Sequence, residues 1–192
     1  MKTRYVILSI VSVLLIAVLI VGRSAIGNLL NGQVHFPEEY IGDVLTMEDG
    51  QRFTMFRRLK VDGNDDGRGT PAIFKVRFRF KNLSTGANKR LSIIPAPFLA
   101  GMEGFQEKDW TINEATNDFQ GIYQWSSHEA AEKYPDSFIF KLMTKRAAPG
   151  TVTYEIIPDT DLSEYLAAIR VPKQAAEVRV NSRGDLSRGQ TR

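Results

Sequence analysis

The alternating run at residues 72–80 constrains the fold of this chain more than any other feature. Its even positions are apolar, with Val76 among phenylalanines, whereas the odd positions from Lys75 onward are basic and include Arg77 and Arg79. Side chains in a strand point alternately to opposite faces of a sheet. This run therefore predicts a strand with one face in a core and the other face polar, as in an antiparallel sheet covered on one side.

The rest of the chain supplies a matching set of elements. Further strands are expected at residues 105–113, 119–125 and 151–157, with an earlier extended piece at 52–61 and a short helix at 162–169. One helical stretch follows Ser84 and is broken at Pro95 and Pro97; another begins at the capping box 126–129 and is interrupted at Pro135. The order strand, helix, strand, strand, helix, strand predicts an α+β, ferredoxin-like βαββαβ domain. Helices on one face leave the other face uncovered, which favours a homodimer packed sheet to sheet.

The N-terminus contains an apolar run from Tyr5 to Val21 between Arg4 and Arg23. About 18 residues of helix span some 27 Å, which is enough to cross a thin bilayer. We expect a single-pass transmembrane helix, with a cleaved secretory signal as the alternative. The basic residues before the run predict that the folded domain is extracytoplasmic.

These features divide the chain into four parts. We expect a membrane anchor with a short basic N-terminus at 1–24, a connector with possible extra strands at 25–71, the ferredoxin-like domain at 72–170 and a basic disordered tail at 171–192. Six basic and two acidic residues follow Ile169, so this segment has a net charge of +4. Because the whole chain has a net charge of +3, the remainder has a net charge of −1. A nearly neutral folded part offers no broad basic surface, and we expect no nucleic-acid partner.

Metal chemistry has little support in the sequence. The chain has no cysteine, and its two histidines, His35 and His128, are far apart. The segment 62–67 matches the opening of a calcium loop, but position twelve is Ile73 rather than the bidentate glutamate, which favours a plain polar turn. His128 is either a neutral base at a helix N-terminus or a surface side chain. We expect no metal site, and the catalytic residues are unknown.

A compact set of residues resembles a known family. The set comprises Gly104, Phe105, Lys108, Trp110, Thr111, Glu114, Gly121, Ile122, Tyr123, Glu129, Ala131 and Tyr134. Together they resemble the YdhR-like mono-oxygenases, over about residues 73–169. The resemblance implies a dimeric α+β barrel, oxidative chemistry without a bound cofactor, and a pocket beside the sheet. Relatives with established oxygenase activity often place an Asn on the first strand and a His on the second helix; here the first strand has Arg77 and Arg79 instead, and Tyr134 stands roughly where the His is expected.

Five side chains are candidates for binding a small-molecule ligand. Arg77 could bind an anionic or quinone-like oxygen from mid-strand, or it could pair with Glu155 on a neighbouring strand. Trp110, Tyr123 and Trp125 could form an aromatic wall around a flat ligand, or they could be core residues. Tyr134 joins them through the resemblance.

The sequence therefore supports one main hypothesis and one alternative. We expect a membrane-anchored mono-oxygenase-like protein that binds a small aromatic or quinone-like molecule. The alternative is a non-catalytic ligand-binding or assembly module of the same fold.

Overall fold

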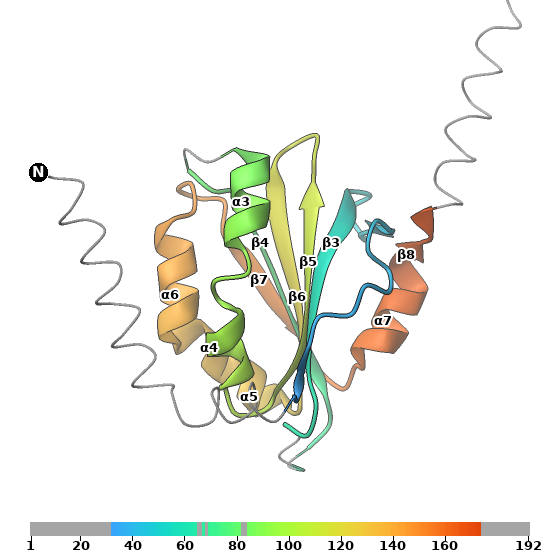
Figure 1. Ribbon diagram of the computed structural model, residues 1–192, viewed down its shortest axis with the longest axis vertical. Helices are drawn as coiled ribbons and strands as arrows, with labels where there is room; N and C mark the ends of the chain where they lie inside the picture. Colours follow the sequence, from blue (N-terminus) through green and yellow to red (C-terminus); the bar gives the residue numbers. More distant parts are fainter. Residues whose placement is uncertain (1–31, 65–66, 68, 82–83, 174–192) are drawn as a thin grey trace, which may run out of the picture.

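The computed structural model describes residues 32–64, 67, 69–81 and 84–173, which contain one curled sheet and its helices (Figure 1). All strand pairings are antiparallel, in the order β7-β4-β6-β5-β3-β2-β8, with β1 paired to β3. The strands are β1 (Val34–His35), β2 (Val44–Thr46), β3 (Arg52–Val61), β4 (Ala72–Phe78), β5 (Phe105–Asn113), β6 (Asp118–Trp125), β7 (Thr153–Ile157) and β8 (Arg170–Val171).

The strand order β7-β4-β6-β5 is the ferredoxin-like arrangement expected from the sequence. The first crossover, from β4 to β5, contains α3 (Thr85–Leu91) and α4 (Ala96–Ala100). The second, from β6 to β7, contains α5 (His128–Lys133), the 3₁₀ turn η1 (Tyr134–Asp136) and α6 (Phe138–Lys145). A last helix, α7 (Leu162–Ile169), follows β7.

The interruptions in both crossovers follow from their prolines and caps. Pro95 separates α3 from α4, and Pro135 lies in η1, between α5 and α6. A proline lacks the N–H that a continuing helix needs. Each new start has a serine cap where the sequence offers one: Ser127 Oγ accepts from Ala130 N, and Ser137 Oγ accepts from Phe140 N. The breaks predicted at Pro95 and Pro135 are therefore present as turns, whereas Pro97 lies in the first turn of α4, where a missing N–H is tolerated.

The sheet is wider than the four-stranded core. Residues 34–61 form β1, β2 and β3, and β3 pairs with β5 over almost its whole length. The register shifts between Met55 and Arg57, where a bulge places Phe56 and Arg57 on the same side. β8 then pairs with β2, so the two ends of the described chain meet at one edge of the sheet.

The helix face of the sheet, defined as the face covered by α3 to α6, carries the larger core (Figure 1). The expected alternation of β4 is confirmed here, since its phenylalanines and Val76 lie in this core. Phe74 meets the rings of Tyr123 and Tyr134 edge to face, at centroid distances of 5.9 and 5.0 Å. Such aromatic pairs add to the stability that buried apolar area already provides.

The opposite face, called the α7 face below, is not left open as the sequence suggested. α7 packs on it, and a second apolar cluster joins the sheet to this helix (Figure 1). The cluster consists of Leu45, Met47, Phe53, Met55, Ile73, Ile122, Leu162 and Leu166. The expectation of an uncovered face is therefore wrong where α7 lies, because segments outside the ferredoxin-like core bury it. The homodimer stays a prediction, without this argument for a sheet-to-sheet contact.

The fold class expected from the sequence also included an N-terminal transmembrane helix, and that part is corrected. Within the described part of the chain, no helix has the length and apolar character needed to cross a membrane. The longest, α6 and α7, have eight residues each, whereas a span needs about 20. The expected span, residues 5–21, and most of the expected tail, 174–192, lie outside the described residues. The fold class is therefore ferredoxin-like α+β with a curled antiparallel sheet, and it no longer includes a transmembrane helix.

Candidate functional site

An apolar slot lies on the helix face, between the sheet on one side and α3, the turn that follows it, and α6 on the other. Its volume is about 70 Å³. Most of its lining is apolar or aromatic, with a few polar groups at its edges. The lining residues are Phe78, Phe80, Asn88, Leu91, Ser92, Ile94, Pro95, Trp110, Phe119, Gln120, Gly121, Ile139, Leu142, Met143 and Arg146.

The mouth of the slot exposes large apolar side chains to solvent. Leu91 and Ile94, from the α3–α4 region, are 38% and 42% exposed, and Leu142 of α6 is 37% exposed. Single exposed apolar residues are ordinary, but these three line the same slot. This combination provides an apolar route from solvent to the sheet.

Trp110 lies on the floor of the slot, in the middle of β5. It is 5% exposed and pairs across the sheet with Gly121 of β6 and Arg57 of β3. The absence of a side chain at Gly121 matters, because a Cβ there would approach Cε2 of Tyr123 to 2.7 Å. The Tyr123 ring therefore leans over Gly121, and the two rings of Trp110 and Tyr123 border the same part of the floor.

The other aromatic candidates form a buried cluster at the deep side of the slot. Tyr134 donates a hydrogen bond to the hydroxyl oxygen of Tyr123 at 3.0 Å, and both rings are buried. Burial raises the pKa of both phenols above the ordinary value, so both stay protonated. Trp125 is fully buried, lies 5.3 Å from the Tyr134 ring, and has no partner for Nε1. Trp125 is therefore a core residue.

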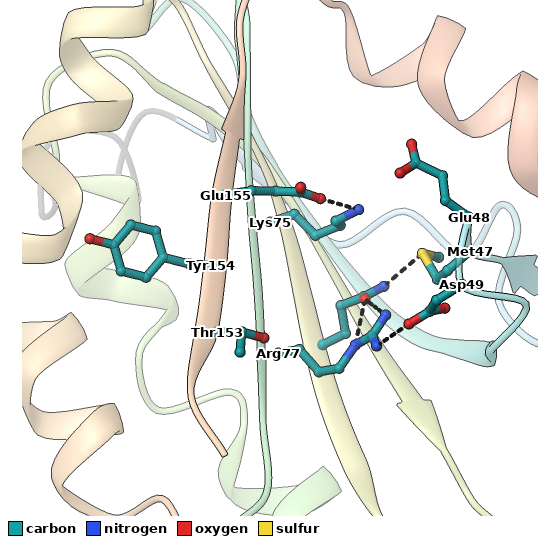
Figure 2. A pocket seen from close by; sticks show the side chains of 9 residues that line it. Met47, Glu48, Asp49, Lys75, Arg77, Thr153, Tyr154 and Glu155 are labelled. Carbon is teal, nitrogen blue, oxygen red and sulfur yellow. Dashed lines mark hydrogen bonds and ion pairs between the residues drawn. The ribbon is translucent and has the colours of Figure 1, made fainter. Parts of the chain in front are cut away.

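Arg77 lies on the α7 face, opposite the four aromatic candidates. It lines a polar hollow of about 450 Å³ (Figure 2). The hollow is formed by Met47, Glu48, Asp49, Lys75, Arg77, Gln120, Thr153, Tyr154 and Glu155. Figure 2 shows Glu155 on the same side as Lys75 and Arg77, whereas the Tyr154 ring points away from them.

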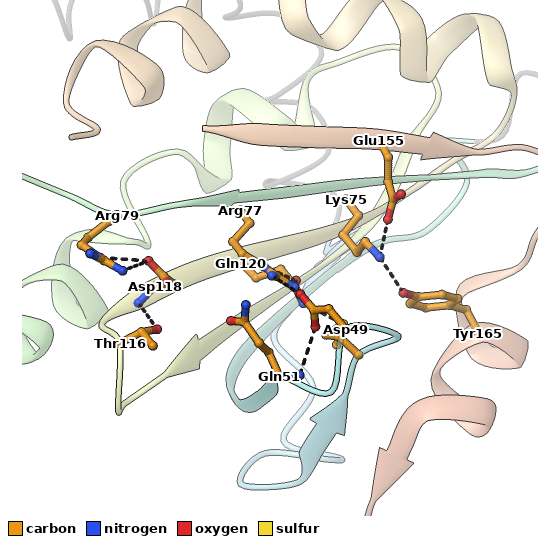
Figure 3. A network of polar contacts seen from close by, with 11 residues as sticks. Asp49, Gln51, Lys75, Arg77, Arg79, Thr116, Asp118, Gln120, Glu155 and Tyr165 are labelled. Atoms are coloured by element: carbon orange, nitrogen blue, oxygen red, sulfur yellow. Dashed lines mark hydrogen bonds and ion pairs between the residues drawn. The ribbon is translucent and has the colours of Figure 1, made fainter. Parts of the chain in front are cut away.

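Both cations of this polar hollow, Lys75 and Arg77, already have carboxylate partners (Figure 3). Arg77 donates to Asp49 at 2.6 Å and to Gln120 at 3.2 and 3.3 Å. Glu155, the expected partner of Arg77, instead pairs with Lys75, because it lies opposite Lys75 in the β4–β7 register. The Arg77 guanidinium lowers the pKa of Asp49. A ligand anion at Arg77 would have to displace Asp49, so the arrangement favours an ion pair that fixes the β2–β3 turn to the sheet.

The structure therefore divides the five sequence candidates between two faces of the sheet. Trp110 lines the slot, whereas Tyr123, Tyr134 and Trp125 are buried in the core of the same face and do not line it. Arg77 lies across the sheet from all of them. The sequence already indicated that Arg77 lies on the other face. Arg77 occupies an odd position in β4 and the phenylalanines occupy even positions, so their side chains point to opposite faces of the sheet.

Two basic residues near the slot were not selected as candidates from the sequence. Lys108 of β5 is 3% exposed, and its Nζ lies 4.3 Å from the Trp110 ring centre and 4.4 Å from that of Tyr123. Arg57 of β3 donates to Ser92 Oγ, a slot residue, at 2.5 Å. The sequence did indicate that Lys108 is buried. It alternates in step with Trp110 and Ile112, so its side chain lies on the same side of β5, where an apolar residue is expected.

A buried ionic cluster occupies the α7 face at β3 and β5. Arg58 Nε donates to Asp109 Oδ1 at 2.8 Å, and Arg58 also pairs with Glu107. Burial raises the pKa of Asp109 to about 7, although Arg58 acts in the opposite direction. Its second carboxylate oxygen is buried without a partner. The Tyr40 ring connects this cluster to Arg170. The centre of the ring lies 4.7 Å from the guanidinium carbon of Arg58 and 3.8 Å from that of Arg170.

No group of three or more potential metal ligands occurs among the residues that the structure describes. His128 lies on the surface of α5, 3.3 Å from Glu132. In the loop after β3, the side chain of Asn64 donates to the carbonyls of Met102 and Phe105 at 2.8 and 2.7 Å. Asn64 thus connects this loop to the start of β5.

Comparisons with known proteins agree with this fold. Residues 73–157 match the family described as "Putative mono-oxygenase ydhR", which confirms the resemblance expected from the sequence. This range runs from β4 to β7 and includes every strand residue on the floor of the slot. The matched residues therefore have the mono-oxygenase-like fold of that family. No curated protein sequence matches the chain.

Solved structures with a similar chain path include three proteins from Listeria. A ferredoxin-fold protein related to antibiotic biosynthesis monooxygenases, from Listeria monocytogenes 4b F2365, is 12% identical with a TM-score of 0.45, over 60% of this chain and 69% of that one. A monooxygenase-like protein from Listeria innocua is 13% identical with a TM-score of 0.43, over the same shares. LmHde, a heme-degrading enzyme from Listeria monocytogenes, is 12% identical with a TM-score of 0.45, over 66% and 97%. Likeness at this level carries no information about function.

Proposed function

We propose that this protein binds a small aromatic molecule in the apolar slot and oxygenates it with dioxygen. The observation that carries the proposal is the slot itself, which has Trp110 on its floor and opens to solvent between exposed apolar side chains of α3, the turn after it, and α6. Ligand sites are concave, mostly apolar and equipped with a few polar groups. The slot has this composition, whereas the two cations of the polar hollow, Lys75 and Arg77, already have carboxylate partners.

The shape of the slot supports a flat ligand. Its volume of about 70 Å³ is below the roughly 300 Å³ of common ligand pockets, so a ligand would insert one ring and leave the remainder at the mouth. The floor offers ring faces and edges from Trp110 and Phe119, which stack well on an aromatic partner. The exposed mouth residues would cover the protruding part.

The oxygenation step is supported by the family match. The matched range supplies all strand residues of the slot floor, so the resemblance concerns the site and not a distant part of the molecule. A second function, binding without turnover, is favoured by another observation. The slot lining includes no carboxylate and no imidazole, the groups that most often move protons in enzymes.

Ligand binding to the full chain tests the slot. 1,4-Naphthoquinol and 2-methoxynaphthalene should bind with a saturable curve in equilibrium dialysis without oxygen, a measurement that does not depend on the number of tryptophans in a variant. Leu142→Trp fills the mouth and should weaken binding at least about tenfold. Phe138→Trp is the matched control, because Phe138 is exposed on the same helix but does not line the slot. Equal affinities for the two variants would contradict the assignment of the slot.

An oxygen electrode then separates the two functions. Oxygen consumption that depends on naphthoquinol and falls in Leu142→Trp, but not in Phe138→Trp, supports oxygenation. The rate of naphthoquinol oxidation without protein is subtracted. Saturable binding with no consumption above that rate would establish the non-catalytic alternative instead.

A further inference from the structure

Arg146 places a guanidinium in the lining of the apolar slot. It caps the C-terminal end of α6, and its carbonyl accepts from the backbone N–H of Lys81 at 3.1 Å. The next residue, Ala147, forms a β-bridge with Phe80. These contacts fix the backbone of Arg146 both to the helix and to the chain that leaves β4. The side chain therefore starts from a defined position at the slot.

The guanidinium of Arg146 lies over an aromatic wall of the slot. Its central carbon is 5.6 Å from the centre of the Phe80 ring, within the range of a cation–π contact. The Phe80 ring meets those of Phe78 and Phe119 at centroid distances of 4.7 and 5.5 Å. All three rings line the slot, so the cation lies beside the surface that a flat ligand would contact.

Arg146 has no acidic partner among the residues that the structure describes. Cations on neighbouring elements do have one. Arg79, just after β4, pairs with Asp118 at 2.9 Å, and Lys89 of α3 pairs with Glu114 at 2.8 Å. None of the described residues that line the slot is a carboxylate. The protein therefore leaves the positive charge of Arg146 without an anion at the place where a ligand would bind.

A second cation without an acid lies close to the slot. Arg57 of β3 is partly buried, and it donates at 2.5 Å to Oγ of Ser92, which lines the slot. The Ser92 hydroxyl donates onward to the carbonyl of Lys89 at 2.8 Å, so it does not neutralise the charge. Burial lowers the pKa of Arg57, because the cation has lost part of its hydration. A nearby anion would compensate for this loss.

We propose that the slot takes an aromatic molecule that carries one anionic group, such as an aryl carboxylate. The ring would enter the apolar lining, and the anionic group would stay at the mouth and accept hydrogen bonds from Arg146. A guanidinium suits this role, because its planar N–H groups match the two oxygens of a carboxylate. Arg57 would add attraction from one hydroxyl away. This inference rests on the proposed function and specifies its ligand class.

Naphthalenes of opposite charge test the inference on the wild-type chain. At pH 7, 2-naphthoate is an anion and 2-naphthylmethylammonium is a cation, although their rings are the same. Equilibrium dialysis at low salt should show at least about fivefold tighter binding of the anion. The difference should narrow as salt is added, because salt screens charges near the surface. Equal affinities at low salt would overturn the inference.

Variants at the end of α6 test Arg146 itself. Arg146→Met should weaken binding of 2-naphthoate about fivefold and change that of 2-methoxynaphthalene, which has no charge, by less than about twofold. Arg146→Lys should keep part of the affinity, because it retains the charge but lacks the planar fork. Lys145→Met is the matched control, since it removes the same charge from the preceding position, which does not line the slot. Leu142→Trp should weaken binding of both compounds.

Binding of 2-methoxynaphthalene separates failure of this inference from failure of the proposed function. If it binds, but Arg146→Met weakens binding of 2-naphthoate no more than Lys145→Met does, the role of Arg146 is overturned and the slot stands. If neither compound binds, or if Leu142→Trp weakens binding of neither, the slot assignment itself fails. Circular dichroism checks that the variants are folded, and the wild-type comparison of anion with cation tests the inference in any case.

Discussion

Buried polar groups have different partners on the two faces of the sheet. On the α7 face, the buried cation Arg58 has two carboxylate partners, and Lys75 and Arg77 of the polar hollow pair with Glu155 and Asp49. On the helix face, the tyrosine hydroxyls bond to each other, and Lys108 has aromatic rings instead of an acid. Ion pairs therefore hold much of the α7 face together, whereas the helix face is packed mainly from aromatic and aliphatic side chains and carries the slot proposed as the ligand site.

The largest loss of stability is expected from Arg58→Met, which breaks the ion pairs of the α7 face. The change leaves Asp109 and Glu107 buried without their cation, and loss of one partner of a buried ion pair costs about 3–5 kcal/mol. Urea unfolding followed by circular dichroism measures the loss. The double variant Arg58→Met with Asp109→Asn should recover part of the stability. A cost below about 1 kcal/mol would show that the cluster is not what holds this face.

Gly121→Ala should disturb the helix face by an intermediate amount. The added Cβ would lie 2.7 Å from Cε2 of Tyr123, and overpacking of this kind costs about 1–3 kcal/mol. The ring must move, so ligand binding in the slot should weaken as well. Thermal unfolding and 2-methoxynaphthalene titration measure the two effects. Gly86→Ala, where no atom lies within 4 Å of the new Cβ, is the matched control.

Asp109→Asn should change how stability depends on pH. The folded-state pKa of about 7 lies above the ordinary value, so the folded protein binds more protons than the unfolded chain between about pH 4 and 7. The stability that Asp109 contributes is full below pH 4 and is lost as the pH rises to 7, with a slope of at most about 1.4 kcal/mol per unit.

The asparagine variant removes this contribution, so its stability should fall less steeply over that range. Urea unfolding at several pH values measures the slope for both proteins. Asp136→Asn, at an exposed position, controls for the loss of one negative charge. Identical slopes for wild type and Asp109→Asn would contradict the assignment of the titration to Asp109.

The smallest effect is expected at the polar hollow. Asp49→Asn removes the ion pair with Arg77, but Asp49 is largely exposed, so the cost should be at most about 0.5 kcal/mol. Binding of 2-methoxynaphthalene on the other face should not change. A loss of binding as large as that of Leu142→Trp would show that Arg77 and its surroundings contribute to the ligand site after all.

Much of the core fold could be predicted from local pattern. The bounds of β3, β5 and α7 agree with the sequence, because alternation, turn residues and the cap at Asp161 are local signals. The breaks at Pro95 and Pro135 were predicted for the same reason. The cover provided by α7 and β2 was not predicted, since β2 and β8 are far apart in the sequence and no local signal pairs them.

The role of the five candidates stays a prediction, but the structure shows where they lie. Trp110 lines the slot, Tyr123 and Tyr134 are core residues of the same face that do not line it, and Arg77 lies on the other face. Residue type attracted attention to Arg77, although its strand parity separated it from the aromatic residues. Lys108 was overlooked for the opposite reason: a lysine in a strand suggests solvent, and only its shared parity with Trp110 indicated burial. Assigning each strand residue to a face from its even or odd position would have separated Arg77 from the aromatic candidates and grouped Lys108 with Trp110.

The pairing of β2 with β8 bears on how the molecule comes to be folded. Asp43 accepts from Arg170 at 2.7 Å and from the backbone N–H of Lys173 at 2.8 Å, across 127 and 130 positions of the chain. Contacts between such distant positions form slowly, because a long loop must close before they give any stabilisation. During synthesis the ferredoxin-like core can assemble as soon as β7 has emerged. The edge formed by β2 must wait until the last strand is released from the ribosome, and an unpaired edge is the part of a nascent chain most exposed to aggregation.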